Sequence, residues 1–154
     1  MRKTYWIVGG FLLCIMAVNL YLYYQHYQIT HLTCQGSATV RDENYTLNAQ
    51  VSLSLSGDIG QSIVNGELTD KDGNVLSVHR SSSFRFKQND NNFYVTNYSV
   101  AELPNNTVDL STLKAFLPPY LLFKDISTRV DIYPISQHGY LITGDEFMHF
   151  FCEK

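Results

Sequence analysis

Few side chains in this 154-residue sequence have the type and spacing that chemistry requires. Its five histidines are scattered and show no metal-ligand spacing: His26, His31, His79, His138 and His149. The sequence also lacks a serine-hydrolase elbow, a zinc-protease motif and a phosphate-binding glycine loop. We therefore expect no catalytic residue, no metal and no cofactor, and we do not expect an enzyme. His79 and His149 could act as pH switches, although ordinary surface histidines would have the same sequence pattern.

The cysteines are the other reactive side chains. Cys14 lies in a long uncharged segment near the N-terminus, which leaves Cys34 and Cys152 in the rest of the chain. Two thiols in an oxidising compartment predict one disulfide. Because the bridge would close nearly the whole domain into one loop, the chain-entropy model gives a stabilisation of about 4–5 kcal/mol. The alternative is two unrelated buried thiols. There is no C-x-x-C motif, which disfavours a redox enzyme.

The uncharged segment from Tyr5 to Tyr24 has the length of a membrane-spanning helix, about 20 residues. Arg2 and Lys3 precede it, so the N-terminus is expected in the cytoplasm of a bacterium and the remainder in the periplasm. A cleaved signal peptide is the alternative, but no A-x-A cleavage site is present. The predicted organisation is a single-pass inner-membrane protein with a cytoplasmic tail (1–4), a transmembrane helix (5–24), a linker (25–32) and a periplasmic domain (33–154).

The periplasmic domain is expected to be mainly β. From Tyr45 to Ser56, apolar and polar residues alternate without interruption, which is typical of a half-buried antiparallel strand. Similar segments separated by turn signals give seven or eight strands, and a sheet of this size can close into a barrel. Cys34 and Cys152 share parity with the less polar faces of the first and last strands. A bridge between them would therefore join the two edges of the barrel.

One segment departs from this pattern. Leu110, Leu113 and Leu117 follow helical spacing, and Pro118-Pro119 ends the run, so we expect one short amphipathic helix over Val108–Leu117. We expect it to cover a sheet face or the mouth of the barrel. Its apolar side chains are the candidate partner surface, together with the aromatic strands near the seam: Leu110, Leu113, Phe116 and Leu117.

Arg80 is the charged residue whose position is most unusual. It shares parity with Leu76 and Val78 before it and with Phe84 after it, so a straight strand would point its guanidinium inward. A buried guanidinium needs a carboxylate, either in an ion pair with the protein or on an acidic ligand. A bulge at Ser81–Ser83 would instead reset the parity and leave Arg80 exposed, and the sequence favours this simpler interpretation.

The arrangement as a whole resembles the FidL-like family of membrane proteins. The resemblance is carried by a short N-terminal anchor, a domain bounded by two cysteines, and the stretches GELTDKDGNVLSVHR and GYLITGDEFMHFFC. It covers most of the exported part, and its motifs are diffuse and non-catalytic. The arrangement is also similar to that of ToxS- and PsaF-type proteins. What the resemblance implies is a lipocalin-like barrel that binds and stabilises the periplasmic domain of a ToxR-type single-span regulator, in some relatives with sensing of bile salts or acidity.

The leading functional hypothesis is therefore an accessory protein that stabilises or modulates a membrane-bound transcription regulator. The alternative is a free-standing envelope barrel that binds a small amphipathic ligand, such as a bile salt. The net charge of −3 gives no basic field, so no nucleic-acid partner is expected. A neighbouring gene for a winged helix with one membrane span would favour the first hypothesis, and a large apolar cavity would favour the second.

Overall fold

The computed structural model describes residues 2–89, 92–136, 139–144 and 149–153. The chain divides into two compact units, a helical unit that ends at His31 and a barrel unit that begins at Leu32. The first unit is the helix α1 (Arg2–Thr30). It forms over the predicted 5–24 segment but continues through Thr30, so most of the predicted 25–32 linker is helical. Within the described residues, no helix is both long enough and apolar enough to cross a membrane.

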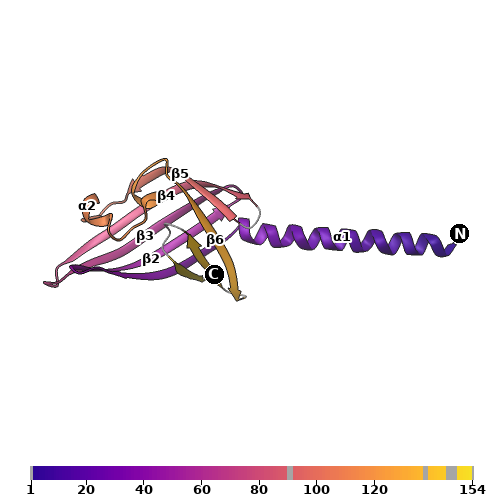
Figure 1. Cartoon of the computed structure of the whole chain (residues 1–154), viewed down its shortest axis with the longest axis horizontal. Helices are drawn as coiled ribbons and strands as arrows, with labels where there is room; N and C mark the ends of the chain where they lie inside the picture. Colours follow the sequence, from indigo (N-terminus) through magenta and orange to yellow (C-terminus); the bar gives the residue numbers. More distant parts are fainter. Residues whose placement is uncertain (1, 90–91, 137–138, 145–148, 154) are drawn as a thin grey trace. The chain divides into compact units, whose positions relative to one another are not determined.

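The second unit is a closed antiparallel barrel of eight strands in sequence order (Figure 1). Each strand pairs with its neighbours in the chain, and the last pairs with the first. The strands are β1 (Thr33–Arg41), β2 (Tyr45–Ser56), β3 (Ile59–Asp70), β4 (Val75–Asn89), β5 (Asn92–Glu102), β6 (Ser127–Ser136), β7 (Gly139–Gly144) and β8 (Phe150–Glu153). The prediction of a mainly β domain that closes into a barrel is confirmed.

The core of the barrel follows the alternation in the sequence. Along β2, every second side chain from Leu47 to Leu55 is buried, and most of those between them are exposed. β1, β2, β3 and β4 pair over long uninterrupted registers, which makes this half of the barrel continuous. Two joins are much shorter. The described residues of β1 and β8 pair only at Gln35 and Glu153, and β5 meets β6 over Phe93–Thr96 alone.

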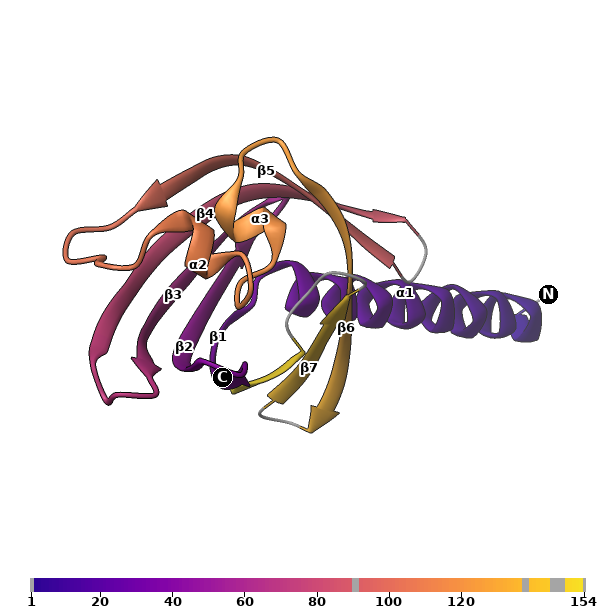
Figure 2. The same ribbon diagram turned by 60° about the vertical axis from the view of Figure 1, so that its left-hand side comes forward.

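A long connection between β5 and β6 covers the inside of the barrel. It holds two single-turn helices, α2 (Leu110–Leu113) and α3 (Pro119–Leu122), which lie within the curve of the sheet (Figure 2). The prediction of one helix over Val108–Leu117 is therefore wrong in its extent. Asp109 caps α2 as expected for a helix start, but the chain turns after Leu113 and a second helix begins with Pro119 at its first position.

Candidate functional site

Arg80 lies inside the barrel. It alternates with the buried residues Val78, Ser82 and Phe84 along β4, and its side chain is only 7% exposed. Its Nε donates a hydrogen bond of 3.1 Å to the carbonyl oxygen of Leu121 in α3. Its Nη1 lies 3.7 Å from Oε2 of Glu102, whose own side chain is 58% exposed at the end of β5. Arg80 thus connects the barrel wall to the covering segment and to a carboxylate that remains in contact with solvent.

The irregularity that the sequence favoured at Ser81–Ser83 lies on the neighbouring strand instead. Ser83 pairs with Ser99, and Phe84 pairs with Asn97, so Tyr98 is the extra residue of a bulge in β5. β4 itself continues without a shift in parity, and Arg80 stays on the inner face. Asn97 points inward in alternation with Phe93 and Val95, and Tyr98 points outward. The bulge reverses the alternation beyond Tyr98, because one extra residue shifts the parity of a strand.

Asn97 makes the densest set of polar contacts in the interior, and its side chain is fully buried. Its Nδ2 donates to the carbonyl oxygens of Tyr120 and Phe123, each at 2.6 Å, and its Oδ1 accepts from the backbone N–H of Ile126 at 2.7 Å. Ser82 donates from its hydroxyl to the same Tyr120 carbonyl at 3.0 Å. Three side chains of the barrel wall therefore satisfy backbone groups at and after α3 that would otherwise be buried without partners.

The side chain of Tyr120 fills the space beneath α3. Burial raises the pKa of its phenol well above the ordinary range, and the nearby hydroxyl of Ser62 opposes part of that rise. Ser62 itself is almost completely buried, and no hydrogen bond of ordinary geometry satisfies its hydroxyl, the one such side-chain atom among the described residues. These groups are neutral at physiological pH and support packing; they are not arranged as a nucleophile with a base.

The predicted partner surface is mostly inside the protein. Leu110 is exposed, but Leu113, Phe116 and Leu117 are buried. The three-and-four spacing that suggested an exposed helix face instead belongs to a compact turn whose apolar side chains insert into the barrel. Three of the four residues are therefore unavailable to a partner, and that part of the prediction is corrected.

The predicted disulfide between Cys34 and Cys152 is shown. Both residues are buried, their Cα atoms are 5.3 Å apart, and the bridge joins β1 to β8 beside the single Gln35–Glu153 pair. The covalent link thus reinforces the thinnest join of the barrel. Cys14, in α1, is free and exposed.

The other end of the barrel interior is apolar and nearly filled. A cavity of about 20 Å³ lies among apolar side chains of β2, β4, β5, β6 and β7: Leu53, Leu55, Phe84, Phe86, Phe93, Val95, Val130, Ile132 and Ile142. That volume holds about one water molecule, whereas sites for small organic ligands are usually about 300–1,000 Å³.

The histidines are not brought together. Nδ1 of His79 lies 3.0 Å from Oδ1 of Asn65 on the outside of the barrel, and His149 is exposed just before β8. His26 lies in α1, and His31 directly follows the last residue of that helix. His138 lies outside the described residues. No group of three or more potential metal ligands occurs in the part of the chain that the structure describes.

Sequence reasoning missed Ser82, Asn97 and Tyr120. Asn97 begins an Asn-Tyr-Ser triplet, which matches a glycosylation acceptor and by itself does not indicate a buried amide. A polar residue at an inward position of β5, in alternation with Phe93 and Val95, was the available signal. The chain matches no protein-family model, and no curated protein matches it either.

Proposed function

We propose that this protein is a membrane-anchored periplasmic accessory protein that acts by binding another protein. The FidL-like resemblance implies that the protein it binds is a ToxR-type single-span regulator. The observation that carries the proposal is the close packing of the barrel interior among the residues that the structure describes. With a cavity of only about 20 Å³ and its polar wall residues engaged by α3, the domain offers its outer surface for binding.

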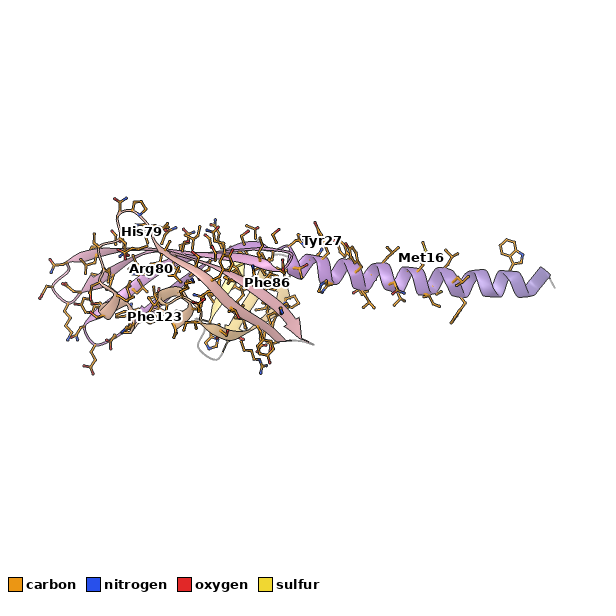
Figure 3. All side chains as sticks on the ribbon, turned by 90° about the horizontal axis from the view of Figure 1, so that it is seen from above. Met16, Tyr27, His79, Arg80, Phe86 and Phe123 are labelled. Carbon is orange, nitrogen blue, oxygen red and sulfur yellow. A yellow bond between two sulfur atoms is a disulfide. The ribbon has the colours of Figure 1, made fainter. Side chains whose placement is uncertain are left out.

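Support for the anchor comes from the side chains of α1. Apolar residues at consecutive positions, including Phe11, Leu12 and Leu13, are all exposed. Side chains project on different sides of the helix (Figure 3). No Asp, Glu, Lys or Arg occurs between Lys3 and Arg41. A helix that is apolar on all sides requires an apolar environment all round, either a protein core or a membrane.

Two measurements test the proposal. A reporter that is active only in the periplasm, fused after Lys154, should be active, whereas a cytoplasm-dependent reporter should not. Affinity purification of the full chain from solubilised membranes should recover the regulator. As a matched control, a chain whose α1 is replaced by an unrelated membrane span should still recover it, because the barrel carries the contact.

Loss of the protein should shorten the lifetime of the regulator or change transcription of its targets, and the complete chain should restore both. Unchanged regulator level, lifetime and output in the deletion strain would refute the accessory function.

The alternative function, binding of an amphipathic molecule, is favoured by the wholly apolar lining of the cavity. It requires the cavity to enlarge more than tenfold to reach the usual size of a ligand site. Titration of the full chain with a bile salt below its micellar concentration, monitored by thermal unfolding, should therefore give no shift. A saturable stabilisation would favour the ligand-binding function over the accessory function.

A further inference from the structure

A groove lies on the outside of the barrel where the first and last strands meet. It has a volume of about 340 Å³ and is lined by residues of β1, β2 and β8: Gln35, Gly36, Ser37, Gln50, Phe151 and Glu153. Gln35 lies opposite Glu153 of β8, and Ser37 lies opposite Gln50 of β2. The volume of this groove, unlike that of the interior cavity, falls within the usual range of about 300–1,000 Å³ for small-molecule sites.

Phe151 gives the groove an apolar edge. Along β8, Phe150 and Cys152 are buried, whereas Phe151 points outward and is 40% exposed. A Cβ on Gly139 of β7 would lie 2.2 Å from Cζ of the Phe151 ring, so the far end of the ring occupies the space that a side chain at position 139 would fill. Contact with the β7 backbone thus holds an exposed aromatic ring in one place beside the groove.

Two glutamines supply neutral hydrogen-bonding groups on the β1 and β2 side of the groove. Both side chains are exposed, and Nε2 of Gln50 donates to Oε1 of Gln35 at 3.4 Å. Each amide has two N–H donors and a carbonyl oxygen with two lone pairs, so this bond uses only part of what the pair offers. The bond orients the two amides relative to each other while they still face solvent.

The surface around the groove is polar but uncharged. The outward side chains of β1 from Thr33 to Thr39, and of β2 from Asn48 to Ser56, are all serine, threonine, asparagine or glutamine. Protein surfaces usually mix charged side chains with polar ones. Among the described lining residues, only Glu153 is charged. An anion would find no cation among them, and a divalent metal ion would find one carboxylate where it needs several oxygen ligands.

A sugar unit matches this combination of groups. The C–H face of a sugar ring packs against an aromatic side chain, and its hydroxyl groups donate to and accept from amides and carboxylates. We propose that the groove binds a neutral glycan, with one sugar unit against the Phe151 ring and hydroxyl groups bonded to Gln35 and Gln50. Glu153 accepts a hydrogen bond from a further hydroxyl. This binding activity goes beyond the accessory function and requires neither the anchor nor the regulator.

A second depression on the outer wall provides a comparison. It has a volume of about 250 Å³ and is lined by residues of β2, β3, β4 and β5: Ser54, Ser56, Ile59, Gly60, Gln61, Ser83 and Tyr98. The guanidinium of Arg85 lies 5.8 Å from the centroid of the Tyr98 ring and covers part of it. Because that ring already has a partner, Gln61 is a suitable control position for the glutamines of the groove.

The test uses the full chain in a zwitterionic detergent, because the headgroups of maltoside detergents are themselves sugars. The probes are chitotetraose and cellotetraose, two neutral tetrasaccharides that differ in their acetamido groups. Saturation-transfer NMR detects the bound sugar, with protein-free micelles as the blank. The groove variants are Phe151→Ala and Gln50→Ala. The matched controls are Tyr94→Ala and Gln61→Ala, since Tyr94 is 47% exposed, like Phe151, and Gln61 is an exposed glutamine.

At least one tetrasaccharide should bind saturably at millimolar concentration. Each groove variant should weaken this binding about tenfold, and the two controls should leave it unchanged. If neither tetrasaccharide binds the natural chain, the inference is overturned. Equal binding by the natural chain and Gln50→Ala would also overturn it. If Phe151→Ala fails to fold, Gln50→Ala decides the outcome, because Gln50 is exposed on β2 and its removal leaves the core intact.

Discussion

Arg80 and Leu121 are joined by a hydrogen bond of 3.1 Å across 41 positions of the chain, from the guanidinium Nε on the barrel wall to the carbonyl oxygen in α3. This bond is one of four by which β4 and β5 hold the covering segment at α3 and Phe123: the others are from Ser82 to Tyr120 and from Asn97 to Tyr120 and Phe123. The inner wall of this barrel thus binds its own chain, at the place where a ligand-binding barrel would hold a ligand.

Replacing Arg80 by alanine should destabilise the domain by about 2–3 kcal/mol, because a buried carbonyl loses a charged donor. Arg80→Lys should recover only part of this, since an ammonium cannot reproduce the guanidinium geometry. The control is Arg85→Ala, which removes an exposed guanidinium stacked 5.8 Å from the Tyr98 ring and should cost less than about 1 kcal/mol. Urea unfolding measures all three variants. Equal losses for Arg80→Ala and Arg85→Ala would contradict the buried role.

Asn97→Ala should be at least as destabilising, by about 2–5 kcal/mol. It takes their Asn97 partner from the Phe123 carbonyl oxygen and the Ile126 N–H, and it leaves the Tyr120 carbonyl oxygen with only the Ser82 hydroxyl as a side-chain donor. The amide of Ile126 should also exchange with solvent faster, which hydrogen exchange can measure directly. Asn48→Ala is the matched control, because Asn48 is exposed on β2 and its side chain accepts a hydrogen bond from the Thr39 hydroxyl. A normal exchange rate at Ile126 would show that Asn97 does not hold the covering segment.

The strands could be predicted from the sequence because burial on one face forces alternation. The alternation predicts a strand over Tyr45–Ser56, which are the bounds of β2, and the parity of Cys34 and Cys152 predicts that both thiols point inward, as they do. The disulfide was expected because two thiols lie in an oxidising compartment, and closure was expected from the number of strands, with the parity of the two thiols as support. These features depend on local pattern, which a single sequence contains.

The interior of the barrel could not be predicted to the same extent. The sequence favoured an exposed Arg80 beside a bulge at Ser81–Ser83, and this prediction is wrong. Alternation cannot show on which of two paired strands a bulge lies, and the bulge is at Tyr98. Leu113 and Leu117 have helical spacing whether the segment forms one exposed helix or two turns folded into the barrel. Tertiary contacts with β4 and β5 decide between these alternatives, and they involve residues far apart in the sequence.

Asp109 makes a contribution to the stability of the domain that depends on pH. Hydrogen bonds from Ser111 and Thr112 lower its pKa to about 2, so its ionised form is favoured in the folded state. The contribution is present above its unfolded pKa of about 3.9 and is lost as the pH falls toward 2. The difference in thermal unfolding midpoint between the natural chain and Asp109→Asn should therefore be constant from pH 7 to 5 and shrink between pH 4 and 2. A difference that does not change over that lower range would contradict the assignment.

Removing the disulfide with Cys34→Ser and Cys152→Ser should destabilise the domain by at most about 4–5 kcal/mol, the chain-entropy value for a bridge that spans 118 positions. The loss should be seen in urea unfolding and as faster proteolysis near β8, the short strand that the bridge secures. Cys14→Ser is the control, because Cys14 is free and lies outside the barrel, and it should leave barrel stability unchanged. Peptide mapping without reductant that finds both barrel thiols free in periplasmic material would contradict the bridge.

Gly36 should be the residue at this join that least tolerates a side chain. A Cβ on Gly36 would lie 2.2 Å from the carbonyl oxygen of Phe151 and 2.8 Å from the Phe150 ring, so β8 would have to move. Gly36→Ala should therefore cost about 1–3 kcal/mol in urea unfolding, whereas Ser37→Ala, at the next position of β1, should cost less than about 0.5 kcal/mol.

The effect should depend on the disulfide. With both barrel cysteines replaced by serine, β8 is free to shift away from β1, so Gly36→Ala should cost less than it does with the bridge present. A double-mutant cycle over Gly36 and the cysteine pair measures this coupling, which we expect at about 0.5–1.5 kcal/mol. Additive losses would show that the close approach of β8 to Gly36 does not depend on the bridge, and that packing of Phe150 and Phe151 alone holds the barrel shut.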